Sequence, residues 1–162
     1  MTDRADSALI AVMEDDVTRA HDLARREHAG QRYGEHDYYT AHLSPVAARL
    51  AAYGPDMENA GVLHDLLEDT DVSVAMLRSE GFPERSIAAI LAVTRQSGES
   101  YHLIARAASH LDSARVKYAD NRSNWDNLST VSDNALRERL TEKYRNAAVV
   151  LERALERLSD DV

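Results

Sequence analysis

Apolar residues recur at steps of three and four along almost the whole chain, which is the spacing of one face of an α-helix. The clearest stripe near the start comprises Ile10, Met13, Val17, Ala20, Ala24 and His28. A second, near the end, comprises Leu136, Leu140, Tyr144, Ala147, Leu151, Leu155 and Leu158. No segment shows the apolar–polar alternation of a half-buried strand. The sequence therefore predicts an all-α fold, a helical bundle of seven or eight helices.

Turn and cap residues set the expected boundaries of these helices. Gly30 is expected to end the first helix, which begins near Ser7, and an irregular loop should follow as far as residue 43. Ser44 and Pro45 are the residue types favoured at an N-cap and at the first helical position, and that helix should stop at Gly54. Further helices are expected over 57–70, 73–80, 83–95 and 100–111. Another should follow with Asp112 or Ser113 as its N-cap, and a C-terminal packing helix is expected over about 133–159.

The length, the net charge and the amino-acid composition limit which classes of protein this chain can belong to. The 162 residues are expected to form one domain, 1–162, and the absence of cysteine excludes disulfides and thiolate metal sites. No apolar run reaches membrane-spanning length, and the acidic N-terminus is unlike a signal peptide, so we expect a cytoplasmic protein. The formal charge of −9 argues against nucleic acid as a partner. A phosphate-bearing substrate would need local positive charge from a metal or from arginines.

The stretch LHDLLEDT, residues 63–70, crowds His64, Asp65, Glu68 and Asp69 among leucines. On one continuous helix these four side chains fall within an arc of roughly 140°. Such an arc is either the acidic face of an amphipathic helix in water or a polar cluster that faces a cavity and binds a metal. The stretch alone leaves both interpretations open.

Two other polar residues occupy positions that suit a metal site. Asp120 shares a helical face with Val116 and Ala119, so it should point inward, where a carboxylate needs an arginine or a metal as its partner. His42 directly precedes a helix, a place where loop residues commonly carry function. Together with His64 and Asp65 they form a mixed nitrogen and oxygen set, which suits manganese, iron or zinc rather than calcium.

The order H…HD…D is similar to the signature of the HD superfamily of metal-dependent phosphohydrolases. The motifs resemble more closely the hydrolase domain of RelA/SpoT enzymes and of its stand-alone relatives, the small alarmone hydrolases and metazoan SpoT homologues. That domain carries H-x-G-Q, Y-x-x-H-P, H-D-x-x-E-D-T and K-x-A-D-x-x-x-N. Over residues 20–130 this chain has, in the same order, HAGQ (28–31), YTAHL (39–43), HDLLEDT (64–70) and KYADNRSN (117–124).

The resemblance implies a site and a reaction. One divalent metal, typically manganese, with iron or zinc as alternatives, would be held by His42, His64, Asp65 and Asp120. Glu68 and Asp69 would orient or activate the attacking water, and Asn124 would lie near the substrate. The reaction would be hydrolysis of the 3′-diphosphate of ppGpp to GDP and pyrophosphate.

Departures from the family pattern concern the base and the phosphates rather than the metal. Where the family has a basic pair around the guanine, this chain has Arg32 and Tyr33, and we expect Tyr33 to stack on a base face. Arg32 is the first candidate for a phosphate-binding cation, and Arg25, Lys117 and Arg122 are further candidates. Leu43 replaces a proline, and Asn121 and Arg122 stand where a basic and an apolar residue are usual.

Two alternatives stay open at the level of sequence. One is a phosphohydrolase that acts on another nucleotide, such as a nucleoside mono- or diphosphate or NADPH. The other is a catalytically silent HD-fold module that binds a nucleotide or a protein. His28 suits either a core position or the site, and His102 and His110 lie where two-metal HD phosphodiesterases place extra ligands. The sequence does not set the oligomeric state.

Overall fold

Long amphipathic helices form where the apolar stripes predict them, and the all-α class is confirmed. The computed structural model describes residues 3–97 and 102–160. The α-helices are α1 (Asp3–Glu27), α2 (Ser44–Leu50), α3 (Pro55–Leu63), α4 (Leu66–Asp69), α5 (Val74–Ser79), α6 (Glu84–Val93), α7 (His102–Ala107), α8 (Leu111–Asp126) and α9 (Asn134–Asp160). Shorter elements are β1 (Arg32–Tyr33), β2 (His36–Asp37), the π-helical turn η1 (Tyr39–Leu43) and the 3₁₀ turns η2 (Ala51–Tyr53) and η3 (Asn127–Thr130).

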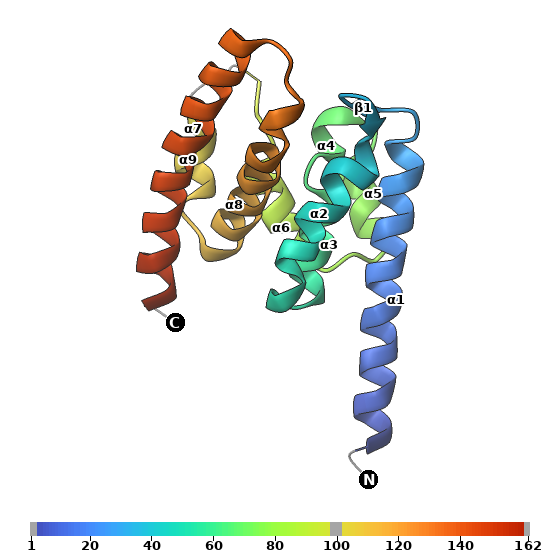
Figure 1. Cartoon of the computed structure of the whole chain (residues 1–162). Helices are drawn as coiled ribbons and strands as arrows, with labels where there is room; N and C mark the ends of the chain where they lie inside the picture. Colours follow the sequence, from blue (N-terminus) through green and yellow to red (C-terminus); the bar gives the residue numbers. More distant parts are fainter. Residues whose placement is uncertain (1–2, 98–101, 161–162) are drawn as a thin grey trace.

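Helix α3 lies at the centre of the bundle and packs against α1, α2, α6 and α8 (Figure 1). Leu63 and Met57 of α3 are fully buried in the main core, as are Leu43 and Ile87 from the neighbouring elements. Burial of each such side chain contributes about 1.5–3 kcal/mol to folding. The motifs that the sequence predicts to bind a metal are therefore attached to the main core.

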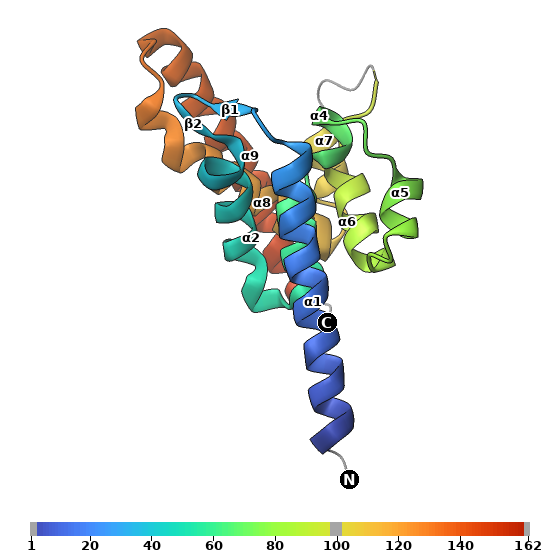
Figure 2. The ribbon, with the colours of Figure 1, turned by 90° about the vertical axis from the view of Figure 1, so that its right-hand side faces the viewer.

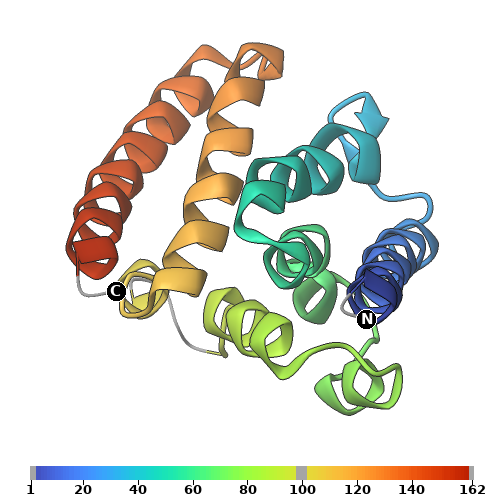
Figure 3. The ribbon, with the colours of Figure 1, turned by 90° about the horizontal axis from the view of Figure 1, so that it is seen from below.

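Helix α8 separates this core from the C-terminal helix. Seen from below, α8 lies between α9 on one side and α2 on the other (Figure 3). A smaller apolar cluster around Leu151 and Ala154 joins α9 to α7 and α8. The first turns of α1 extend past the other helices (Figure 2). No helix among the described residues is long and apolar enough to cross a membrane.

The expected loop over residues 30–43 is more regular than the sequence predicts. Arg32 pairs with Asp37 and Tyr33 with His36 in a two-residue antiparallel hairpin, with Gly34 at φ 60° in its turn. The hairpin is too short to show strand alternation, so the period-two test could not detect it. Its second strand leads into the π-helical turn η1, which carries His42.

Two expected caps are wrong. Ser44 has helical backbone angles and makes no side-chain cap, because the chain is already helical through η1 when it reaches α2. Helix α8 begins at Leu111 after His110, one residue before the predicted caps Asp112 and Ser113. The cap at Ser73, by contrast, is present, and its hydroxyl accepts the backbone N–H of Met76 at 3.3 Å.

Candidate metal centre

The HD dipeptide does not lie on one continuous helix, as the sequence predicts, but in a break between α3 and α4. Helix α3 ends at Leu63, and Asp65 has φ −95° and ψ −3°, a bridge-region conformation found at turns and in many active sites. The break redirects the chain while keeping both side chains beside the core. His64 is buried, and the Asp65 side chain is 21% exposed.

The other two predicted ligands come from different elements. The N–H of Ser44 bonds to the carbonyl of Tyr39, five residues earlier, so the π-helical turn η1 carries His42 within an otherwise helical segment. Single π-turns of this kind are frequent at functional sites. His42 is 2% exposed, and Asp120, in the middle of α8, is 7% exposed.

These four side chains converge on one point. The Nε2 atoms of His42 and His64 lie 3.3 Å apart. Oδ2 of Asp65 lies 3.0 Å from His64 Nε2 and 3.5 Å from His42 Nε2. Oδ1 of Asp120 lies 3.4 Å from His42 Nε2 and 3.7 Å from His64 Nε2.

Hydrogen bonds on the far sides of the imidazoles orient them toward this point. Nδ1 of His64 lies 2.8 Å from the carbonyl of Gly61, which can only accept, so Nδ1 carries a proton; in the neutral tautomer Nε2 would be left to bind a metal. The same tautomer in His42 lets its Nδ1–H donate to Ser123 Oγ at 3.3 Å. Partners of this kind fix the orientation of metal-binding histidines.

The carboxylates are held in the same way. Tyr38 donates its hydroxyl to Oδ2 of Asp65 at 2.6 Å. Asp120 accepts from Lys117 Nζ at 2.7 Å and from Asn124 Nδ2 at 2.6 Å. The partner of the buried Asp120 is thus a lysine and two imidazoles, not an arginine.

The donor set fits a divalent transition metal. Ligand atoms about 2.0–2.2 Å from one ion, at angles between octahedral and tetrahedral, lie about 2.8–3.6 Å from one another. The distances between Nε2 and oxygen atoms here span 3.0–3.7 Å. Ligand atoms of His42, His64 and Asp65 all lie within 4.8 Å of one another, and Asp120 completes the set from α8. Two imidazoles with two carboxylates match the ligand preferences of manganese, iron or zinc.

The charges of the four groups are strongly coupled. Burial opposes the charged form of His64, but Asp65 and Asp120 outweigh it and raise the pKa of His64 to about 10. Burial likewise opposes protonation of His42, and hydrogen bonds to the same carboxylates leave its pKa above the ordinary value. Burial favours neutral Asp120, yet Lys117 and the imidazoles hold its pKa well below the usual range. The carboxylates thus form a centre that favours positive charge.

Glu68 and Asp69 follow on α4, and both are exposed. Oε1 of Glu68 accepts the backbone N–H of Arg95, and the Glu68 side chain lines the cavity above the centre. Asp69 instead lines a shallow acidic depression on the outer side of α4. Partial burial, followed by the charges of Asp65 and Glu68, raises the pKa of Asp69 above its ordinary value.

A cavity of about 660 Å³ opens onto the centre between α4, α8 and α9. His42, Asp65 and Asp120 lie on its wall, together with Asn124. Its cations are Arg95, Lys117 and Lys143. Among the described residues no carboxylate pairs with Lys143, whose Nζ lies 5.6 Å from the ring centroid of Tyr144.

Arg32 and Tyr33, the two hairpin residues expected to bind the substrate, are not among the residues that line the cavity. Arg32 donates to the carbonyl of Glu35 within the hairpin and does not line the cavity. Tyr33 stacks on His42, with centroids 5.2 Å apart and an interplanar angle of 7°, and donates its hydroxyl to Asn124 at 2.7 Å. One face of Tyr33 is thus already covered, and its hydroxyl orients the predicted catalytic asparagine. Whether either residue binds substrate stays a prediction.

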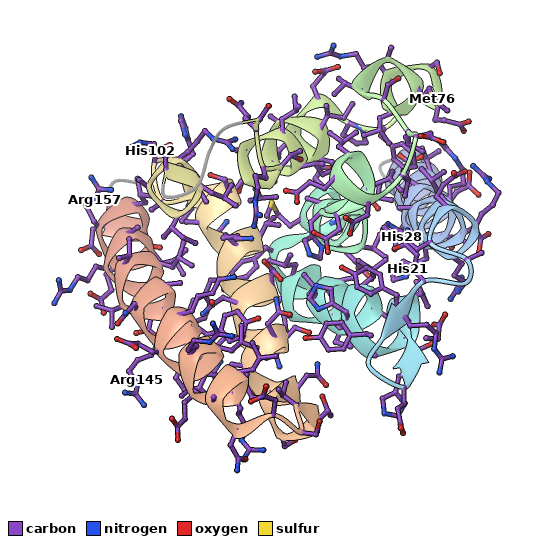
Figure 4. The ribbon with its side chains drawn as sticks, turned by 90° about the horizontal axis from the view of Figure 1, so that it is seen from above. His21, His28, Met76, His102, Arg145 and Arg157 are labelled. Carbon is purple, nitrogen blue, oxygen red and sulfur yellow. The ribbon has the colours of Figure 1, made fainter. Side chains whose placement is uncertain are left out.

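The remaining histidines do not join the centre. His28, directly after α1, is buried and pairs with Gln31 Oε1 at 2.8 Å, while His102 on α7 is exposed at the opposite side of the bundle (Figure 4). His110 is exposed and bonds to Ser109. The structure therefore gives no support to a two-metal arrangement built with His102 or His110.

Sequence reasoning did not assign several residues around the centre. Tyr38, not the motif tyrosine Tyr39, bonds to Asp65, whereas Tyr39 bonds to His21 at 2.7 Å. Arg95 and Lys143 come from segments without a recognisable motif, and only the fold brings them to the cavity. Ser123 had a signal in the sequence, since it shares the inward face of α8 with Asp120.

No family model matches the chain. Among curated proteins, a segment of 83 residues, half of this chain, is 35% identical to the guanosine-3′,5′-bis(diphosphate) 3′-pyrophosphohydrolase of Aquifex aeolicus. A segment of the same length is 37% identical to the probable enzyme of that name from Synechocystis, and 66 residues are 38% identical to the GTP pyrophosphokinase of Streptomyces coelicolor. The matches cover 12%, 11% and 8% of these longer relatives.

A solved structure extends the likeness to nearly the whole chain. It is described as a metazoan ortholog of SpoT that hydrolyses ppGpp, and it superposes with a TM-score of 0.70 over 90% of this chain and 94% of the other, at 20% identity. The chain has the fold of a SpoT ortholog. The fold and the curated matches are thus likenesses to proteins of the RelA/SpoT kind, the same group of proteins that the motifs resemble.

Proposed function

We propose that this chain is a metal-dependent phosphohydrolase that removes the 3′-diphosphate of ppGpp and releases GDP and pyrophosphate. The observation that carries the proposal is the convergence of His42, His64, Asp65 and Asp120 beside a cavity that also holds three cations. The curated relatives named for this reaction and the SpoT ortholog that hydrolyses ppGpp supply the substrate.

The cavity suits such a substrate in size and in charge. Its volume of about 660 Å³ lies within the usual range for sites that enclose a small molecule. The chain has a net charge of −9, so a polyanion needs local cations, and Arg95, Lys117 and Lys143 supply them at the cavity wall. Lys117 stays charged because Asp120 raises its pKa against the opposing effect of burial.

A divalent metal bound by the two imidazoles and two carboxylates, manganese in our proposal, would lower the pKa of water and polarise a phosphoryl oxygen. The chain's own residues then have defined tasks. Lys117 and Asn124 hold Asp120 in place, and the Tyr33 hydroxyl fixes the amide of Asn124. The cavity cations bind the phosphates, while Tyr38 restrains Asp65.

Glu68 and Asp69 are the two candidates for the proton acceptor. Glu68 lines the cavity, so its carboxylate is the better placed of the two to face a nucleophilic water. Asp69 has the raised pKa, which brings it closer to the pH at which a general base works best. We assign proton acceptance to Glu68 and an electrostatic role to Asp69.

The test is steady-state turnover of ppGpp, its adenosine counterpart, GDP and NADPH, each with manganese and with a chelator. We expect ppGpp to be the best substrate and turnover to require the metal. Asp120→Asn should abolish both activity and bound metal by elemental analysis, whereas Asp22→Asn, an exposed carboxylate on α1, should change neither. If another nucleotide is hydrolysed while ppGpp is not, a broader HD phosphohydrolase replaces this proposal; no turnover at all would indicate a silent nucleotide-binding module.

A further inference from the structure

A second concavity lies on the opposite side of α8 from the metal centre. Its volume is about 240 Å³, and its walls carry Arg49 from α2, Tyr53 from η2, and Arg115, Tyr118 and Arg122 from α8. We call it the arginine pocket. Three arginines in one small hollow are unusual for a chain with a net charge of −9.

The carboxylates near these arginines do not neutralise them fully. Arg49 and Arg122 share one carboxylate, Asp126, and the contact from Arg122 is loose at 3.8 Å. Arg115 lies 3.6 Å from Asp112, which already accepts two shorter bonds from Arg85.

One more carboxylate stands at the edge of the pocket, where Glu152 accepts the hydroxyl of Tyr118 at 2.8 Å. None of these three carboxylates is among the residues that line the pocket, and Asp112 is bound more closely by Arg85, which lies outside it. Exposed ion pairs of this kind contribute at most about 1 kcal/mol, so an incoming anion competes with them at little cost.

The pocket also has the shape for a small anion. Tyr53 stacks beneath the guanidinium of Arg115, 4.2 Å from its ring centroid, which fixes that side chain at the pocket wall. A volume of about 240 Å³ lies below the range for a whole drug-sized ligand, so it suits one group rather than a complete nucleotide. Three arginines line this one hollow, and planar guanidinium groups match the oxygens of phosphate.

We propose that the arginine pocket binds one phosphate group, carried either by free phosphate or by the end of a nucleotide. The pocket lies where a bound phosphate would link two helices near the metal centre. Arg115 and Arg122 lie on the face of α8 opposite Asp120, and Arg49 lies two turns beyond His42. A phosphate held between them bridges α2 and α8. Helix α8 carries Asp120, and α2 continues directly from η1, which carries His42. The proposal does not depend on the reaction proposed above.

The experiment is calorimetric titration of the metal-free, chelator-treated protein with inorganic phosphate, pyrophosphate and GMP. The Lys143→Ala background is used so that binding in the catalytic cavity is weakened. We expect Arg49→Gln and Arg122→Gln each to raise the Kd for phosphate by about 10-fold, the effect of one lost charge-assisted contact. Arg78→Gln, an exposed arginine paired with Glu84 on the other side of the molecule, is the matched control and should change nothing.

Two further readouts make the outcome decisive. First, Glu152→Gln removes the carboxylate at the pocket edge, so it should lower the Kd for phosphate. Second, phosphate should raise the Tm of the wild type but not that of the Arg49→Gln/Arg122→Gln double variant. GMP binding with the same dependence on arginine would identify a nucleotide as the source of the phosphate, and its absence would identify the free ion. Phosphate affinity that is unchanged in both arginine variants, or no binding at millimolar phosphate, overturns the proposal.

Discussion

Gly61 connects the packing of the core to the geometry of the metal centre, and replacing it with alanine tests that connection. A Cβ at this position would lie 2.7 Å from Cδ1 of Leu50 and 3.0 Å from the backbone Cα of Ala47, both on α2. The Leu50 methyl group can rotate away, but the α2 backbone can give way only if the helix moves. The carbonyl of Gly61 also accepts the Nδ1–H of His64.

Two opposing effects set the expected change in the free energy of unfolding of Gly61→Ala. Gly61 lies inside α3, where alanine is intrinsically better than glycine by about 0.5–1 kcal/mol. Overpacking against a close neighbour costs about 1–3 kcal/mol. We therefore expect Gly61→Ala to lower the free energy of unfolding by about 1–2 kcal/mol. Because α2 follows directly from η1, its displacement moves His42 relative to His64, and metal affinity should fall by about 10–100-fold, as for loss of a supporting partner.

Urea unfolding of the chelated protein, followed by circular dichroism, measures the stability, and calorimetric titration with manganese measures the affinity. The Leu50→Ala background provides a control, because removing Cδ1 relieves the shortest contact, and the cost of Gly61→Ala should then shrink. If Gly61→Ala alone stabilises the protein by about 0.5–1 kcal/mol and leaves metal binding intact, α2 and α3 are not packed as closely as described and the reasoning fails.

Three other predictions follow from the site. Lys143→Ala should raise the KM for ppGpp at least several-fold more than Arg32→Ala, because only Lys143 lines the cavity; steady-state kinetics that give the opposite order would favour the original assignment of Arg32. Glu68→Gln should lower kcat by about 10²–10⁴-fold with little change in manganese affinity, which separates proton acceptance from metal binding, and a loss within a few-fold would exclude that role. The Tm of the chelated protein should fall as pH rises from 6.5 toward about 10, because the raised pKa of His64 means that its protonated form stabilises the fold. Saturating manganese should remove this fall in Tm. A Tm that rises with pH in the presence of chelator would contradict the described cluster.

Much of the fold could be predicted because apolar spacing along a helix reflects burial directly. The stripe ending at His28 lies on α1, and the stripe from Leu136 to Leu158 lies on α9. The break between Leu63 and Leu66 could not be predicted, because His64 and Asp65 are compatible with a helix and only tertiary packing ends it there. The hairpin escaped detection for a different reason, since two residues per strand are too few to show a period.

Some residues of the candidate site could be predicted from the sequence, and others could not. The convergence of the four predicted metal ligands could be predicted because each stands in a motif with a recognisable residue order. Their role as ligands stays a prediction. Tyr38, Arg95 and Lys143 have no such motif, and their place beside the centre depends on how α9 and the segment after α6 pack. Long, flexible cations are also poor sequence signals, because most of them are simply solvated.

If this centre hydrolyses the 3′-diphosphate of ppGpp, as we propose, the identity of the products reveals the reaction. Purified protein with manganese and ppGpp should yield GDP and pyrophosphate in equal amounts, resolved by anion-exchange chromatography and by ³¹P NMR. The Asp120→Asn variant should yield neither product. Intact ppGpp after prolonged incubation with the metal-loaded protein, or release of orthophosphate in place of pyrophosphate, would contradict the account.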